Sequence, residues 1–217
     1  ISELIGREMK SALNSKELLQ DRVNKFGDIV LTRFPPEPNG YLHIGHCKAM
    51  RFNFMQAKIN NGKCYLRFDD TNPTKENKEF IENIKENIKW MGYEPWKVTH
   101  SSDNFEQLYQ FAVQLIKQGD AFVCSESAEE MRKKRGEGLP SKDRDRPIEE
   151  NLRLFNEMRM GLYEEGAYSL RARIDPKHPN TTMRDPVIYR IRFHHHPHVG
   201  DKWCVYPLYD YTHPICD

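Results

Sequence analysis

The sequence has few cysteines, and their spacing fits neither a disulfide framework nor a structural zinc site. The 217 residues include 5 cysteines, an odd number, with no Cys-x-x-Cys pair. This pattern excludes the disulfide-rich secreted scaffolds and the zinc ribbons, and it is typical of a reducing compartment. The thiols are spread over the whole chain, at Cys47, Cys64, Cys124, Cys204 and Cys216.

Long apolar runs, a leader segment and an excess of one charge are also absent. No apolar run approaches the ~18 residues of a membrane span. The first residues, Ile1 to Leu4, have no signal-peptide profile. We therefore expect a cytoplasmic protein with no membrane partner. The 33 basic and 32 acidic residues nearly cancel, so any binding to nucleic acid must depend on a local patch.

Enough apolar residues are present for a folded core. Hydrophobic residues make up 38% of the chain and aromatic residues 11%, which excludes a fully disordered protein. At ~150 residues per domain, the length allows one large domain or two small ones.

The first hundred residues alternate between strand and helix patterns. Residues 28–34 are an apolar, β-branched run typical of a buried strand, and residues 63–69 alternate as a second strand. A helix is predicted between them, from near His46 to Asn60. Asn72-Pro73 is a good N-cap and first-turn pair for another helix. This order of elements is typical of a parallel α/β sheet.

The pattern changes to α+β after about residue 120. Trp203–Tyr209 is predicted to return to the first sheet as a strand. The elements predicted before it are a helix over 103–117, a capping box at 127–130, a charged loop over 132–146, a helix over 147–161 and a strand over 187–193.

The sharpest chemical feature is a stiff turn followed by two histidines. Pro35–Gly40 cannot be helical, and His43-Ile-Gly-His46 comes next at a predicted helix start. Strand ends in open α/β sheets line the ligand crevice, and helix N-termini favour anions. The two imidazoles can then donate N–H groups to charge that develops on a phosphate, while Gly45 permits a flat base close to the backbone. The plain alternative is a turn with two surface histidines.

Four segments resemble class I aminoacyl-tRNA synthetases of the branch specific for glutamine and glutamate. They are Thr32–His46, Arg67–Pro73, Met183–Arg190 and Trp203–His213. The last is similar to the glutamine enzymes in its Thr-His after Tyr-Asp-Tyr, whereas the next residue, Pro214, is more typical of the glutamate enzymes. The resemblance covers about residues 27–217.

The resemblance implies an α/β fold in which an inserted domain interrupts a Rossmann-like, parallel-sheet, nucleotide-binding half. The inserted α+β domain would bind the acceptor stem of tRNA. We expect a helical N-terminal extension at 1–26, the inserted domain at 103–202, and a Rossmann-like catalytic domain, incomplete at its C-terminus, at 27–102 and 203–217.

The resemblance also implies an ATP site and an amino-acid site. Asp69 would hold the α-amino group, because a carboxylate at a strand end can meet an ammonium group. Tyr209 would read a side-chain amide, since a phenol oxygen can accept an amide N–H and a carboxylate has none to give. His213 and Arg33 would lie nearby. The ordinary alternatives are a core position for Tyr209 and a helix N-cap for Asp69, although Asp70 suits the N-cap better. The ATP site would be lined by Glu37, Pro38, Asn39, His43, Ile44, Gly45, His46, Cys47, Lys48 and Ala49.

Basic residues of the charged loop and of the rest of the inserted domain are expected to contact the tRNA backbone, since such contacts need only positive charge. A solvated charged loop is the alternative. The candidate tRNA contacts are Arg132, Lys133, Lys134, Arg135, Arg184 and Arg190.

The segment His194–His198 contains four histidines but no ligand set at the usual spacing, so we expect a polar loop and no protein-held metal. Magnesium would arrive with ATP.

The expected reaction is the ATP-dependent ligation of glutamine to its tRNA through an aminoacyl-adenylate, with His43 and His46 as the catalytic residues. The alternatives are a glutamate-specific enzyme of the same branch and a non-catalytic tRNA-binding fragment. The sequence has no Lys-Met-Ser-Lys-Ser-like second signature and does not begin with Met. We therefore expect the N-terminal part of a longer enzyme, weak or inactive alone. Membership of a multi-synthetase assembly is left open.

Overall fold

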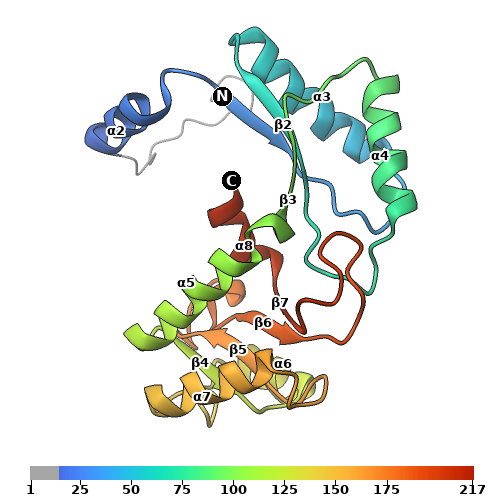
Figure 1. Cartoon of the computed structure of the whole chain (residues 1–217). Helices are drawn as coiled ribbons and strands as arrows, with labels where there is room; N and C mark the ends of the chain where they lie inside the picture. Colours follow the sequence, from blue (N-terminus) through green and yellow to red (C-terminus); the bar gives the residue numbers. More distant parts are fainter. Residues whose placement is uncertain (1–14) are drawn as a thin grey trace.

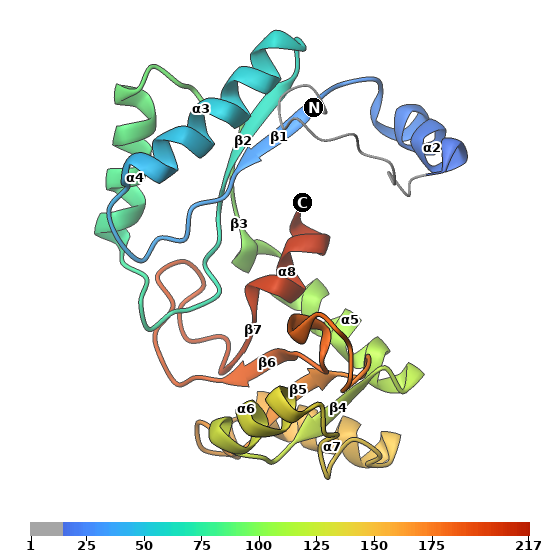
Figure 2. The same ribbon diagram turned by 180° about the vertical axis from the view of Figure 1, so that it is seen from behind.

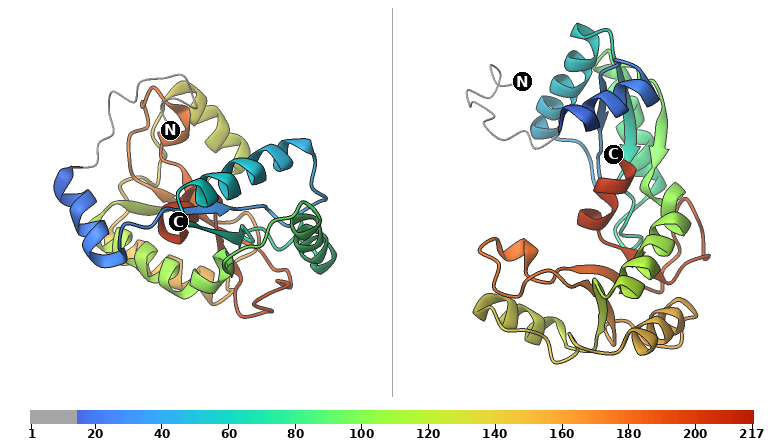
Figure 3. Two further views of the ribbon diagram at one scale, coloured as in Figure 1. Left: turned by 90° about the horizontal axis from the view of Figure 1, so that it is seen from above. Right: turned by 90° about the vertical axis from the view of Figure 1, so that its left-hand side faces the viewer.

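The computed structural model describes residues 15–217, which form two lobes (Figure 1). One lobe contains a three-stranded parallel sheet and the other a four-stranded antiparallel sheet, and the side view in Figure 3 shows one above the other. Helix α2 (Lys16–Phe26) precedes the first sheet. It confirms the predicted N-terminal helix from residue 16, and the rest of that prediction lies outside the described residues.

The first lobe confirms the predicted parallel α/β arrangement. Its strands pair in the order β1-β2-β3. Both crossover helices pack on one face of the sheet, as right-handed connections between neighbouring strands require (Figures 1 and 2). Phe34, Leu66 and Phe68 point into this core and meet buried residues of both helices. The elements are β1 (Leu31–Phe34), α3 (Ile44–Ile59), β2 (Lys63–Phe68), α4 (Lys78–Trp90) and β3 (Val98–His100).

The opposite face of the parallel sheet carries charge. Side chains alternate along a strand, so Arg33 and Arg67 lie on the face away from Phe34, Leu66 and the two crossover helices. Helix α8 (Tyr209–Cys216) lies between the two lobes, next to this polar face (Figures 1 and 2). Its C-terminal end is directed at the parallel sheet. The candidate amino-acid site is built in this space.

The second lobe is an antiparallel sheet covered by helices. Its strands pair in the order β4-β5-β6-β7, and α5 and α7 contribute residues such as Leu108 and Phe155 to its core. The chain enters this lobe from β3 through η1 (Ser101–Asn104). The remaining elements are α5 (Phe105–Gln118), β4 (Ala121–Cys124), α6 (Ala128–Glu137), α7 (Ile148–Arg159), β5 (Ser169–Ala172), η2 (Thr181–Met183), β6 (Val187–Ile191) and β7 (Val205–Pro207). Across residues 15–217, no helix has both the length and the apolar character of a membrane span.

The prediction that Trp203–Tyr209 returns to the first sheet is wrong. Val205–Pro207 instead pairs antiparallel with β6, with Val205 opposite Ile191. The connection from β6 is a loop over 192–204 with no helix in it, which suits an antiparallel neighbour, and Val205 and Tyr206 are fully buried in the core of the second sheet. The chain returns toward the first sheet one element later, as helix α8.

Two predicted boundaries also differ from the structure. The helix expected to begin at Asn72-Pro73 begins at Lys78, because the side chain of Asn77 caps it by accepting a hydrogen bond from the N–H of Glu79 at 3.0 Å. Segment 132–146 is not one charged loop, since its first six residues complete α6. That helix begins with the predicted capping box of Ser127 and Glu130 and continues through the basic residues 132–135.

Candidate active site

The proline-rich turn after β1 is fixed against the chain that comes after β2. The carbonyl of Pro36 accepts a hydrogen bond from the N–H of Asp69 at 3.0 Å, and that of Pro38 accepts one from Asn77 at 3.3 Å. Pro36 and Pro38 are buried, whereas Glu37 and Asn39 between and after them are exposed. The turn therefore presents the polar members of the predicted ATP set to solvent on a rigid support.

His43 and His46 cap the start of α3 reciprocally. Nδ1 of His43 accepts the N–H of Gly45 at 3.1 Å, and Nδ1 of His46 accepts the N–H of His43 at 3.1 Å. The ring centroids are 4.0 Å apart. Because each Nδ1 accepts a backbone proton, each neutral ring carries its own proton on Nε2. Partial burial and the neighbouring His43 lower the pKa of His46, which favours this neutral form.

Gly45 is required for the contact between these two caps. A Cβ at this position would lie 2.9 Å from Cε1 of the His43 ring, too close for that ring to stay in place. The sequence predicts a different role for Gly45, in which the missing side chain lets a flat base approach the backbone. The rest of the predicted ATP set lies on the first turns of α3, where Ile44, Lys48 and Ala49 are exposed and Cys47 is half-buried.

Asp69 lies in a buried position at the end of β2. Its Oδ2 accepts a hydrogen bond from Nε2 of His213 at 2.7 Å, and its Oδ1 accepts one from the Ser101 hydroxyl at 3.4 Å. Asp69 caps no helix, because the N-cap of α4 is Asn77. The N-cap alternative for Asp69 is thus wrong, and a buried carboxylate faces α8 across the gap between the lobes.

Tyr209 and His213 stand one turn apart on α8, with ring centroids separated by 5.8 Å. Tyr209 is 54% exposed, so its alternative interpretation as a core aromatic is wrong. The sequence predicted Asp69, His213 and Tyr209 as one set, and the structure brings them together in a row that crosses from β2 to α8. We call these three residues the amino-acid row.

Arg33 lies beside a buried arginine that was not among the residues predicted from the sequence. Both Arg33 and Arg67 bind the carboxylate of Asp217, at the end of the α8 segment. Arg67 is 1% exposed, and its Nε and Nη2 have no hydrogen-bond partner among the described residues. Arg67 could have been found from the alternation of side chains along a strand, because this alternation places Arg33 and Arg67 on the same face of the sheet. Ser101, the partner of Asp69, was also missed, and no motif marks it.

The predicted tRNA contacts divide into two groups. Arg132 and Lys133 are exposed on α6. The others have protein partners or are partly buried: Lys134 pairs with Glu126 at 2.5 Å, Arg135 donates to the Thr181 carbonyl, Arg184 donates to the carbonyls of His178 and Arg135, and Arg190 is half-buried with a lowered pKa caused by burial. Arg132 and Lys133 are therefore the two residues of the set whose positive charges are most accessible to a ligand.

A buried acidic pair lies beneath the loop between β6 and β7. Asp70 accepts hydrogen bonds from the N–H and the hydroxyl of Ser102, at 2.9 Å and 2.6 Å, so it holds η1 and does not fill the helix N-cap role expected from the sequence. Glu76 accepts from the N–H of Asn72, and its other oxygen lies 3.5 Å from Nε2 of His196. Burial raises the pKa of Asp70 to about 7, and burial together with Asp70 raises that of Glu76 to about 8.

Glu76→Gln is expected to remove a pH-dependent loss of stability. The folded carboxyl keeps its proton up to about pH 8, against 4.5 for the ordinary group, so folding takes up a proton in this range. Raising the pH through this window therefore destabilises the native chain. Denaturant unfolding between pH 5 and pH 9 should show the variant gaining on the wild type as pH rises, by about 1.4 kcal/mol per unit of pKa shift. The control is Glu86→Gln, an exposed carboxyl on α4, the helix that begins just after Glu76; equal slopes for both variants would contradict the assignment.

Comparisons with known proteins identify the family of this chain. Residues 29–217 match the family described as tRNA synthetases class I (E and Q), catalytic domain. The chain is 55% identical over 204 residues to a probable glutamine–tRNA ligase of Dictyostelium discoideum, and 53% identical over 198 residues to a glutamine–tRNA ligase of Ralstonia nicotianae. These alignments cover 94% and 87% of this chain but 26% and 34% of the relatives, so the chain spans about a quarter to a third of their length.

The fold is also similar to that of solved glutamate–tRNA ligases. The crystal structure of one from Elizabethkingia meningosepticum, in complex with its amino acid, superposes with a TM-score of 0.59 at 20% identity, over 88% of this chain and 42% of the other. An enzyme from Elizabethkingia anophelis gives a TM-score of 0.60 at the same identity. With the family match extending over most of its length, the chain belongs to the class I tRNA synthetases of the glutamate and glutamine group and forms part of their catalytic domain.

Proposed function

We propose that this chain is part of the catalytic region of a glutamine–tRNA ligase, which joins glutamine to its tRNA at the expense of ATP. The observation that carries the proposal is the amino-acid row: a buried carboxylate, an imidazole bonded to it at 2.7 Å, and an exposed phenol one helical turn away. A carboxylate suits the α-amino group, and a phenol oxygen can accept a proton from a side-chain amide. The glutamine–tRNA ligases among its relatives support the same assignment.

The proposed chemistry has two steps. The glutamine carboxylate attacks the α-phosphorus of ATP, an oxygen–phosphorus bond forms, and the bond to the bridging oxygen breaks to release pyrophosphate. A ribose hydroxyl at the end of the tRNA then attacks the acyl carbon of the adenylate, and AMP leaves. ATP enters as a substrate together with its Mg²⁺. The protein contributes position and electrostatic stabilisation, and no covalent protein nucleophile is needed.

His43 and His46 would act on the phosphates in the first step. Their mutual capping fixes both rings with Nε2–H as the free donor at the N-terminus of α3. That end of a helix favours anions, and N–H donors held in place stabilise charge that builds up on the α-phosphate in the transition state. Arg132 and Lys133 would contact the tRNA backbone from the second lobe, since both are exposed on α6.

Tyr209→Phe tests the choice of amino acid in the longer enzyme that contains this chain. Without the hydroxyl, the amide of glutamine loses its acceptor, at a cost of about 1–3 kcal/mol, or roughly 5- to 150-fold in kcat/KM for glutamine. Use of glutamate should change less, so the preference for glutamine should narrow. The measurement is tRNA charging with each amino acid.

Tyr211→Phe is the matched control for this experiment. It removes a hydroxyl from the same helix, but that hydroxyl donates to the Leu108 carbonyl in the second lobe. It is expected to lower stability slightly and to leave the preference unchanged. An unaltered preference in Tyr209→Phe would refute the role of the phenol. Better charging of glutamate than of glutamine by the unaltered enzyme would assign it to the glutamate branch, and absence of pyrophosphate exchange would favour a tRNA-binding role alone.

A further inference from the structure

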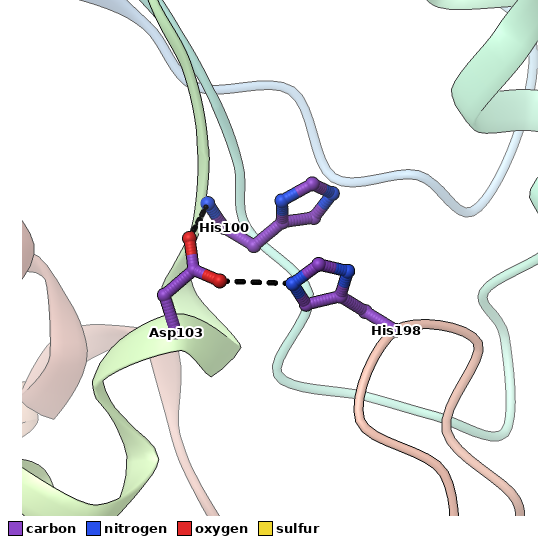
Figure 4. Close-up of side chains that lie close together, drawn as sticks. All are labelled: His100, Asp103 and His198. Carbon is purple, nitrogen blue, oxygen red and sulfur yellow. Dashed lines mark hydrogen bonds and ion pairs between the residues drawn. The ribbon is translucent and has the colours of Figure 1, made fainter.

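Three side chains of the kinds that bind transition metals meet where the two lobes approach each other. His100 ends β3, Asp103 lies in η1, and His198 lies in the loop between β6 and β7 (Figure 4). One donor atom from each lies within 4.8 Å of the others. Nε2 of His198 is 2.8 Å from Oδ1 of Asp103, whose Oδ2 accepts the N–H of His100 at 2.8 Å. Residues almost a hundred positions apart thus bring two nitrogens and one oxygen within 4.8 Å of one another.

The two imidazoles lie face to face. Their centroids are 3.8 Å apart and their planes differ by 11°. Neutral imidazole is the form of histidine that binds metal ions. Asp103 and His198 remain partly open to solvent, with side-chain exposures of 47% and 37%. An ion can therefore enter, and a water molecule can complete its coordination.

The neighbouring histidines do not offer the same chemistry. His196 belongs to a second cluster with Asp70 and Glu76, but both of its ring nitrogens are engaged. Nε2 bonds the Asp70 carbonyl at 2.9 Å, and Nδ1 accepts the N–H groups of His198 and Val199. His195 has a carboxylate partner in Asp201, and both are largely exposed. Among the described residues, the cluster in Figure 4 is the one group that combines two imidazoles and a carboxylate.

We propose that His100, Asp103 and His198 form a binding site for a divalent transition metal ion, with Zn²⁺ as the best match. Two imidazole nitrogens and one carboxylate oxygen are a common zinc ligand set, and zinc sites with three protein ligands keep a fourth position for water. Such an ion would connect the β3–η1 junction to the loop between β6 and β7. It would thereby link the two lobes next to the amino-acid row. The proposal does not depend on the proposed function.

The test is Co²⁺ titration of the purified full chain, followed by displacement with Zn²⁺. Co²⁺ at a site with two nitrogens and a carboxylate should give a saturable visible spectrum with one ion per chain, and Zn²⁺ should abolish it. His198→Ala is expected to weaken binding at least about tenfold, because even changes behind the ligands of metal sites weaken binding by about 10- to 100-fold. Zn²⁺ should also raise the Tm of the wild type and not that of the variant.

Two further variants keep the outcome clear. Asp103→Asn retains the shape of the side chain and an oxygen for the N–H of His100, yet it should weaken binding as His198→Ala does. His195→Ala removes an exposed imidazole from the same loop and should bind as the wild type does. The proposal is overturned if the wild type gives no saturable Co²⁺ spectrum, if His198→Ala binds as tightly as the wild type, or if His195→Ala loses as much affinity as His198→Ala.

Discussion

Replacing His46 with alanine is expected to slow adenylate formation by the longer enzyme about 10²- to 10³-fold. The Nε2–H of His46 is held at the start of α3 by the hydrogen bond that its Nδ1 accepts from His43. Loss of one such preorganised donor typically costs this much in kcat, because the donor acts on charge that exists only in the transition state. The measurement is ATP–pyrophosphate exchange in the presence of tRNA, together with the KM for ATP, which should change much less than kcat.

A pair of substitutions separates the catalytic role of His46 from its capping role. Gln and Glu at the third helical position can both reach back to the N–H of the capping residue, so His46→Gln and His46→Glu should preserve the start of α3. Only Gln also offers an N–H donor to the phosphates, whereas Glu brings a negative charge. We expect His46→Gln to keep measurable exchange and His46→Glu to lose it. Equal activity of the two variants would show that His46 serves the helix alone.

Replacing Asp69 with asparagine is expected to have the largest effect on amino-acid binding. Asp69 is 7% exposed and already accepts hydrogen bonds from His213 and Ser101. Neutralising it removes the charge that we propose faces the ammonium group of the substrate. Truncation of one partner of a buried charge pair costs about 2–5 kcal/mol, or roughly 30- to 4,000-fold in affinity. The KM for glutamine should rise accordingly, while that for ATP should stay within a few-fold.

Asp120→Asn provides the matched control for Asp69→Asn. Asp120 is an exposed carboxylate just before β4 in the second lobe, so the same chemical change is made far from the amino-acid row. It should leave the KM for glutamine unchanged. If Asp69→Asn behaves like the control, the ammonium group of the substrate binds elsewhere. Arg33 and Arg67 could not bind it, because they carry the same positive charge as the ammonium group.

The parts of this structure that could be predicted from sequence depend on local rules. The strand before Pro35, the stiff turn after it and the helix that starts at the histidine pair were all visible, since proline geometry and helix capping act over a few residues. Burial of that strand was predicted wrongly, because only Phe34 in it is buried. Asp69, His213 and Tyr209 were predicted as a set from a family resemblance. The structure adds the contact between them, because β2 and α8 bring Asp69 and His213, 144 positions apart, to hydrogen-bond distance.

The rest depended on contacts that local patterns do not encode. Val205–Pro207 reads as a buried strand in either sheet, and only the pairing with β6 decides between them. Asn72-Pro73 and Asn77 are both acceptable helix starts, and the bond from Asn72 to Glu76 favours the later one. Arg67 was hidden because an arginine within a strand usually marks an exposed position, whereas this one is buried against Asp217.

Helix α8 has a mechanical consequence for amino-acid recognition. Only Leu208 separates it from β7, the edge strand of the antiparallel sheet, and Ile215 and Cys216 of the helix pack against the core of that lobe. Tyr209 and His213 on the same helix form one side of the amino-acid row. A tilt of the antiparallel sheet would therefore move the phenol and the imidazole relative to Asp69. The geometry of the amino-acid row thus depends on how the two lobes are placed relative to each other.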